Sequence, residues 1–180
     1  MQKQLLELCG TIDRLELLFR GGGVARYHSE PSMHKQSVAE HSWRVMVLLL
    51  HFWPQCPART LKAALFHDVS EGYHGDVPAP VKRVPSLRAH YDDMEKAFLE
   101  HVGLTEHFDL PAAENARLKV CDYLELCITC KAQQGRAPAR VFTNGYRYVA
   151  ELLNGPLRSD PMINTLVEFL ARVSKGEFYG

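Results

Sequence analysis

The chain has 180 residues, of which 46% are hydrophobic and 23% are charged, and this composition is typical of a globular protein with a sizeable core. Its 21 basic and 21 acidic residues cancel, which excludes a general electrostatic attraction to nucleic acid or to an anionic membrane. Charged side chains interrupt the first apolar residues, no run is long enough for a membrane span, and the five cysteines are scattered. These features predict a single cytoplasmic domain over residues 1–180 without a disulfide framework.

Apolar residues recur at intervals of three and four through most of the chain, and this periodicity predicts an all-α fold. The first helix is expected over about residues 3–20, where three consecutive glycines end it and form a hinge. After an irregular segment over 24–36, Ser37 and Glu40 have the capping-box spacing for a helix that runs to about Phe52. Further helices are expected at residues 58–72, 86–102, 112–134, 138–154 and 161–174.

Two polar residues, His67 and Asp68, interrupt the apolar stretch from Leu61 to Val69. Adjacent side chains on a helix point about 100° apart, so both cannot face solvent, and an unpartnered imidazole or carboxylate among apolar residues is costly. His41 and Asp122 occupy similar apolar segments, and Asp122 lies in an apolar stripe at steps of four. A divalent cation would compensate all of them, and the proposed ligands are His41, His67, Asp68 and Asp122.

Two imidazoles and two carboxylates suit Mn²⁺, Co²⁺, Fe²⁺ or Zn²⁺ and, less well, Mg²⁺. Each of these residues alone is more often an ordinary core or surface residue, and the combination favours a metal chiefly through the family resemblance described next. Cys127 and Cys130 form a CxxC motif, but no second pair completes a zinc site. We interpret these two cysteines as small buried thiols in a helix.

Four segments carry a resemblance to the HD-domain phosphohydrolases, whose pattern is His…His-Asp…Asp on a helical bundle. They are SVAEHS over residues 37–42, HDVSE over 67–71, GDVPAPVK over 75–82 and VCDYL over 120–124. Over about residues 13–130 the chain resembles the bacterial 5′-deoxynucleotidase branch and its phage relatives, the small dATP triphosphohydrolases. The resemblance implies a single-domain HD-type bundle, a bound divalent cation, a deoxynucleotide substrate and, for a viral protein, residence in the host cytoplasm.

The resemblance also implies residues for the chemistry. Glu71 follows His67 by four residues and Asp68 by three, so on a continuous helix it shares their face. In the resembling enzymes the glutamate at this place handles the attacking water, which makes Glu71 the candidate general base or orienting group. Asp76 is the next candidate, as a second acid/base or as an anchor for its loop, although an ordinary turn aspartate needs no function.

The substrate-binding candidates flank this centre. Arg26 lies fifteen residues before His41, a spacing that matches the family, and it could clamp phosphate together with Lys82. Tyr27 stands where the bacterial branch has a tryptophan, and an aromatic wall there could exclude a 2′-hydroxyl. The smaller tyrosine, with its own hydroxyl, weakens the expected deoxy selectivity. Ala79 replaces a threonine common in that branch, so one hydrogen bond that the resemblance implies is missing. The complete set is Arg26, Tyr27, Pro78, Ala79 and Lys82.

These observations predict a metal-dependent phosphohydrolase of 2′-deoxynucleotides, leaning toward a dATP or dNTP triphosphohydrolase that releases deoxynucleoside and triphosphate. A 5′-deoxynucleotidase acting on monophosphates is the direct alternative. An inactive HD-fold nucleotide-binding module is less well supported, because the ligand pattern and Glu71 are intact. A phosphodiesterase for RNA or cyclic dinucleotides is a further alternative, but this chain lacks the stripe of basic residues expected for a polymeric substrate.

The resemblance further implies a homo-oligomer, a dimer or a higher even assembly. The balanced charge and the lack of a membrane span predict no nucleic-acid or membrane partner. The apolar segment over residues 162–173 could supply the interface between copies or could complete the core.

Overall fold

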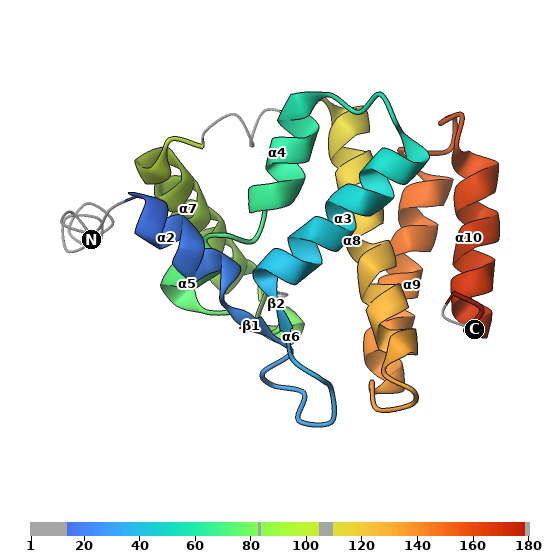
Figure 1. Cartoon of the computed structure of the whole chain (residues 1–180), viewed down its shortest axis with the longest axis horizontal. Helices are drawn as coiled ribbons and strands as arrows, with labels where there is room; N and C mark the ends of the chain where they lie inside the picture. The colour runs from blue at the N-terminus through green and yellow to red at the C-terminus, as the bar shows by residue number, and fades with distance from the viewer. Residues whose placement is uncertain (1–13, 83, 105–109, 179–180) are drawn as a thin grey trace.

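The computed structural model describes residues 14–82, 84–104 and 110–178, and its elements are almost all helical, as the sequence predicts (Figure 1). The helices are α2 (Arg14–Gly22), α3 (Val38–Phe52), α4 (Ala58–Phe66), α5 (Glu71–His74), α6 (Ala79–Lys82), α7 (Pro85–Val102), α8 (Ala112–Ala132), α9 (Ala139–Asn154) and α10 (Ile163–Lys175). A two-stranded antiparallel ribbon, β1 (Ala25–Arg26) with β2 (Gln36–Ser37), was not predicted. The predicted cap of α3 is confirmed, since the Ser37 hydroxyl accepts a hydrogen bond from the Glu40 amide at 3.1 Å.

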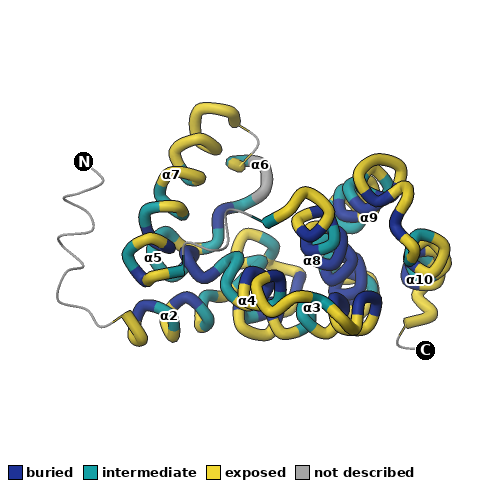
Figure 2. The backbone as a smooth tube through the Cα atoms, turned by 90° about the horizontal axis from the view of Figure 1, so that it is seen from above, coloured by how far each residue is buried: buried dark blue, intermediate teal, exposed yellow. Residues whose placement is uncertain are grey.

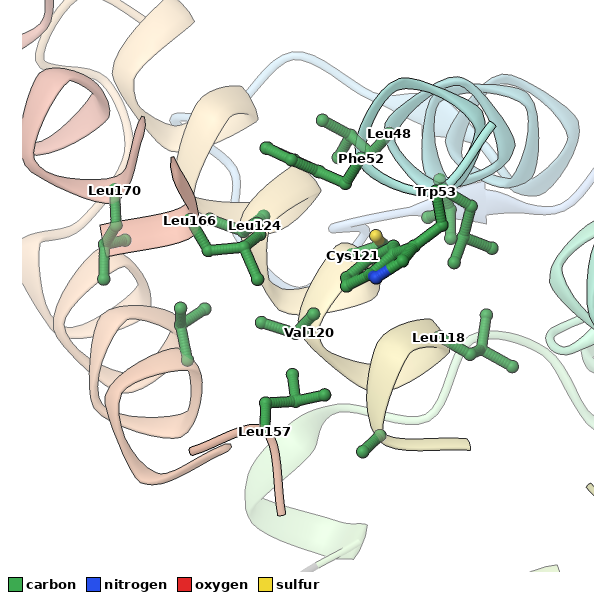
Figure 3. Packing of buried hydrophobic residues seen from close by; sticks show 14 of the residues in the cluster. Leu48, Phe52, Trp53, Leu118, Val120, Cys121, Leu124, Leu157, Leu166 and Leu170 are labelled. Atoms are coloured by element: carbon green, nitrogen blue, oxygen red, sulfur yellow. The ribbon is translucent and has the colours of Figure 1, made fainter. Parts of the chain in front are cut away.

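The larger hydrophobic core lies where α3, α4, α8, α9 and α10 meet, and Figure 3 shows part of its packing. Leu49 of α3, Leu124 of α8 and Leu166 of α10 are almost completely buried in it. Burying a leucine of this kind contributes roughly 1.5–3 kcal/mol. Helix α10 therefore completes the core with its inner face. Figure 2 shows the buried residues of α8 between α3 and α9.

A smaller core joins α2, α7 and the turn before α5, and its buried members are Leu17, Val69, Phe98, Leu99 and Val102. The predicted hinge at the glycines is wrong, because α2 continues to Gly22. Gly21 and Gly72 instead permit a close approach of α2 to α5: a Cβ on Gly21 would lie 2.2 Å from the Val69 carbonyl oxygen, and one on Gly72 would lie 2.6 Å from the Gly21 nitrogen. The predicted residues 3–13 of the first helix lie outside the described residues.

The prediction of one continuous helix over 58–72 is also wrong. Helix α4 ends at Phe66, residues 67–70 form turns, and α5 begins at Glu71. Neighbouring positions on a straight helix diverge by about 100°, so this break allows His67 and Asp68 to face one centre. Cys127 and Cys130 are buried in α8, as predicted. No helix in the described ranges is long and apolar enough to cross a membrane.

Candidate metal centre and substrate pocket

Three helical segments bring two imidazoles and one carboxylate to a single point. His41 comes from the first turn of α3, His67 from the end of α4, and Asp122 from the middle of α8. The His41 Nε2 atom lies 3.1 Å from His67 Nε2 and 3.1 Å from Asp122 Oδ1, and His67 Nε2 lies 3.8 Å from the same oxygen. Their ligand atoms all lie within 4.8 Å of one another, so these side chains could share one ion.

The hydrogen bonds of the two rings show which of their nitrogens is free to bind a cation. His41 Nδ1 lies 2.7 Å from the Glu125 carboxylate, and His67 Nδ1 lies 2.8 Å from the Ala64 carbonyl oxygen. Both partners are acceptors, so each Nδ1 carries a proton and donates it. In neutral rings the two Nε2 lone pairs then face each other across 3.1 Å. A cation resolves this conflict, because it turns two opposed acceptors into two ligands.

Glu125, which the sequence analysis did not single out, holds His41 from behind. Its carboxylate is almost fully buried, and one oxygen accepts hydrogen bonds from the Gln36 amide and the Thr129 hydroxyl, both at 2.7 Å. Burial favours the neutral acid, but the hydrogen bonds from His41 and Thr129 outweigh it and lower the Glu125 pKa. The sequence feature that could have pointed to Glu125 is its position three residues after Asp122 in a largely apolar predicted helix. A carboxylate that orients a ligating imidazole is a common feature of metal sites.

Asp68 lies at the edge of this centre and also pairs with Arg26. Its Oδ2 atom is 3.4 Å from His67 Nε2 and 3.6 Å from His41 Nε2, and it accepts a hydrogen bond from the Arg26 guanidinium at 2.5 Å. Burial opposes ionisation of Asp68, but His67 and Arg26 nearby more than offset it and keep its pKa below the ordinary range. Arg26, predicted as a phosphate clamp, is thus bound to a predicted metal ligand.

The donor set fits a divalent cation. Burial opposes ionisation of Asp122 too, but without a cation the His41 and His67 rings can donate to it from Nε2 in their protonated form, which holds the Asp122 pKa well below the usual value. Ionised carboxylate oxygens and imidazole Nε2 atoms are ligands that Zn²⁺, Mn²⁺, Co²⁺ and Fe²⁺ share. The residues that would hold the ion are His41, His67 and Asp122, with Asp68 at the open side.

A cavity of about 510 Å³ opens next to this centre, and His67, Asp68 and Asp122 are in its wall. Glu71 also lines it, with only 4% of the residue exposed. One Glu71 oxygen lies 3.4 Å from the Lys82 ammonium, and the other has no hydrogen-bond partner among the described residues. Burial and the Asp68 carboxylate raise the Glu71 pKa to about 8. A buried carboxylate with a free oxygen, facing the pocket, is placed to accept a proton or orient water.

Asp76 anchors the loop that precedes α3. Its Oδ2 atom accepts a hydrogen bond from the Tyr27 backbone amide at 3.0 Å and lies 3.4 Å from His28 Nδ1. This bond steadies Tyr27, whose φ of 60° is rare for a side chain of its size. The same bond ties the loop that contains Asp76 to the loop before α3, which is consistent with the predicted role of Asp76 as an anchor for its own loop, and its acid/base role stays a prediction.

The remaining predicted residues fall around the same cavity. Tyr27, Pro78 and Lys82 line it, whereas the side chain of Ala79 lies outside what the structure describes. Helices α8 and α9 supply the opposite wall, which was not predicted from the sequence: Lys119, Tyr123, Leu126, Val141, Asn144, Gly145 and Tyr148. On each helix these positions recur at intervals of three and four residues. A helix face packed on the core has the same spacing, so the sequence pattern alone does not reveal a cavity wall.

Comparison with known proteins identifies the class that this fold and centre define. The family model for the HD domain matches residues 23–141. The chain therefore belongs to the HD domain family.

Two curated phage proteins are similar in sequence. A dATP triphosphohydrolase of cyanophage S-2L is 31% identical over 133 residues, which cover 70% of this chain and 72% of the relative. A dATP triphosphohydrolase of Salmonella phage PMBT28 is 29% identical over 121 residues, which cover 60% of this chain. The match spans 61% of that relative's own length.

Solved structures support the fold. The HD phosphohydrolase of cyanophage S-2L, bound to dA and one catalytic Zn²⁺ ion, matches with a TM-score of 0.72 at 19% identity over 94% of this chain and 99% of that one. A conserved hypothetical protein from Pyrococcus furiosus matches with a TM-score of 0.68 at 20% identity, over 92% and 99% of the two chains. These matches confirm the predicted HD-type helical bundle.

Proposed function

We propose that the protein is a metal-dependent phosphohydrolase of 2′-deoxynucleotides, with dATP as the preferred substrate and deoxynucleoside and triphosphate as products. The observation that carries this proposal is the pair of opposed Nε2 atoms of His41 and His67, 3.1 Å apart beside two ionised aspartates. The resemblance to two phage dATP triphosphohydrolases and to a structure holding dA and Zn²⁺ supports the substrate class.

The bound cation would act as a Lewis acid on phosphate oxygen and would make water a better nucleophile. Glu71 borders the cavity with one unpartnered oxygen, so it can take or orient the proton of the attacking water. Lys82, beside Glu71, brings positive charge to the same wall. Arg26 donates to Asp68 and also lines the cavity, so it can hold the Asp68 carboxylate in place and neutralise the charge of a bound phosphate.

The charges along the cavity support a triphosphate more than a monophosphate. The face of α8 that lines the cavity carries Lys119, then Asp122 and Tyr123, then Leu126. Lys119 adds a cationic side chain on the side away from Leu126, whereas Arg88, which also lines the cavity, is paired with Asp92 at 3.7 Å. An outer phosphate of a triphosphate that is bound at Asp122 could reach Lys119, whereas a monophosphate there could not.

Tyr27 lines the cavity, and its hydroxyl is buried without a hydrogen-bond partner in the described part of the chain. Its ring can crowd a ribose 2′-hydroxyl, but its free hydroxyl could also bond one, so the proposed preference for deoxyribose rests on the similarity to the two phage enzymes.

A product assay tests the proposal. Purified protein with Mn²⁺, Co²⁺ or Zn²⁺ is given each deoxynucleotide as mono- and triphosphate, and chromatography separates nucleoside, phosphate and triphosphate. We expect deoxyadenosine and triphosphate from dATP. Phosphate released only from dAMP would support the deoxynucleotidase alternative, and no turnover of any deoxynucleotide would contradict the proposal.

We also propose that copies of the chain self-associate through α3. Three apolar residues on one face of α3 are exposed, with Trp43 at 63%, Val47 at 44% and Leu50 at 43%. Their spacing allows the same stripe on a second copy to pack antiparallel against it about a two-fold axis. Sedimentation equilibrium should show a dimer or larger even assembly that Trp43→Glu weakens; a monomer at all concentrations would contradict this proposal.

A further inference from the structure

Helix α9 presents a face to the substrate cavity that the proposed chemistry does not use. Val141, Asn144, Gly145 and Tyr148 occupy positions i, i+3, i+4 and i+7, and all of them line the cavity. Gly145 permits this, because a Cβ there would lie 3.1 Å from both Leu126 Cδ2 and Cys127 Sγ of α8. The missing side chain lets α9 lie close to α8, so that its neighbour Asn144 borders the space in front of Leu126.

The order of residues along the two helices shows which end of the substrate this face meets. Helices α8 and α9 lie side by side (Figures 1 and 2), the rings of Tyr123 and Tyr148 stack at 4.7 Å, and Gly145 lies against Leu126. The helices are therefore antiparallel, and Asn144 lies beyond Asp122 on the side opposite Lys119. With a rise of about 1.5 Å per residue, Lys119 and Leu126 are separated by roughly 10 Å along α8. A nucleotide can span this length, with its phosphates toward the Lys119 cation and its base toward the apolar residues Leu126 and Val141 at the α9 end.

The α9 end of the cavity is suited to a base and not to phosphate. Its cation, Arg140, is already paired with Glu30 of the opposite loop at 2.5 Å. Leu126, Val141 and Gly145 supply apolar surface for the faces of a base. Asn144 is half-buried there and makes no hydrogen bond to the described residues, so its amide is available to a ligand.

We propose that Asn144 is the base-recognising residue of this enzyme and selects adenine by pairing its amide with the N6 amino group and N7 of the base. The inference rests on the proposed function and adds the origin of base preference to it. An asparagine amide offers one acceptor and one donor, which match the amino donor and N7 acceptor of adenine. Guanine presents two acceptors at O6 and N7, so one of its contacts with the same amide is repulsive. Tyr148 and Tyr123 form the stacked wall next to this contact.

The test measures kcat/KM of the metal-loaded enzyme for dATP, dGTP and 7-deaza-dATP, which lacks the N7 acceptor. A bidentate amide contact discriminates by roughly 10- to 100-fold. We expect Asn144→Ala to lose about that factor for dATP and to retain its rate on dGTP, which brings the two rates together. Wild type should lose rate on 7-deaza-dATP, whereas the variant should not distinguish it from dATP.

A matched control is available on the same helix. Asn154 donates to the Ala150 carbonyl oxygen at 2.9 Å, is exposed, and does not line the cavity. Asn154→Ala should leave the ratio of dATP to dGTP unchanged, and equal thermal melting of both variants would show that folding is intact. An Asn144→Ala enzyme that is active and keeps the wild-type ratio would overturn the inference while leaving the proposed function in place. An absence of turnover by wild type on every deoxynucleotide would overturn both.

Discussion

Two sets of carboxylates lie on or beside α8, and they are satisfied in different ways. Near the start of the helix, Glu114 accepts hydrogen bonds from the Arg59 guanidinium and from the Thr60 hydroxyl. Asp160 accepts from Trp53 Nε1, from the Met162 amide and from Arg117. Every contact of this outer set joins a donor to an acceptor. Such pairs hold the helices together and require nothing further.

The inner set, Asp122 and Glu71, lacks this matching of donors to acceptors. Asp122 faces two imidazoles whose Nε2 atoms are themselves acceptors in the neutral rings, and one Glu71 oxygen has no partner among the described residues. Burial raises the Glu71 pKa to about 8, whereas hydrogen bonds to Arg59 lower the pKa of Glu114 to about 2. Burial of acidic groups alone thus does not indicate a site. The unsatisfied acceptors do, because they have a use only when a cation, water or substrate is present.

The largest effect is expected from Asp68→Ala. Removing this carboxylate takes away one negative charge at the open side of the centre and leaves Arg26 without its partner. We expect metal retention and turnover to be lost together, measured by metal analysis after gel filtration and by the product assay. Full turnover in this variant would contradict the proposed metal centre.

Glu71→Gln separates the proton-handling group from the ligands. The amide keeps the size of the side chain but cannot accept a proton, so turnover should fall by roughly 10²- to 10⁴-fold while metal content stays unchanged. The wild-type rate should rise with pH as Glu71 loses its proton, and the variant should lack this rise. Equal loss of metal would instead make Glu71 a ligand or a support for one.

Glu125→Gln tests the group behind His41. The amide retains the volume of the side chain and can still accept from His41, but it replaces a charged acceptor with a neutral one. Metal affinity should fall by about 10- to 100-fold, since partners of this kind raise the basicity of the ligating ring. Competition with a chelator measures the change, and an unaltered affinity would exclude Glu125 from supporting the ion.

Asp160→Asn addresses the outer set and should change stability alone. Losing the charged contact to Arg117 should lower the free energy of unfolding by roughly 1–3 kcal/mol, measured by urea titration of the metal-free protein. Its hydrogen bonds keep the Asp160 pKa below the usual value against the effect of burial, so its stabilisation is complete above about pH 4 and is lost on acidification. Wild type and variant should therefore converge in acid, with turnover of the metal-loaded enzymes equal at neutral pH. A variant that loses turnover would show that the outer set serves the site.

Much of the fold could be predicted because helices are local structures. The spacing of apolar residues and the Ser37 cap determine where α3 lies, and α7 to α10 lie close to the predicted ranges. The break after Phe66 could not be predicted, because it depends on contacts between segments far apart in the chain. Val69 packs into the smaller core with Leu17 and Phe98, and the close approach of Gly72 to Gly21 brings α5 against α2.

The sequence by itself determined the chemistry available to this protein, because an imidazole or carboxylate in an apolar segment needs a partner wherever the chain folds. That reasoning, together with the resemblance to the HD-domain phosphohydrolases, predicted His41, His67, Asp68 and Asp122, and the structure brings His41, His67 and Asp122 within ligand distance of one another. Only the tertiary structure decided which nitrogen of His41 faces the centre, since Glu125 is 84 residues away. It also decided that α9 forms a wall of the cavity. The orientation of His41 and the α9 wall both depend on packing between segments far apart in the chain. Helical periodicity predicts which face of a helix is buried, but not which segment packs against it.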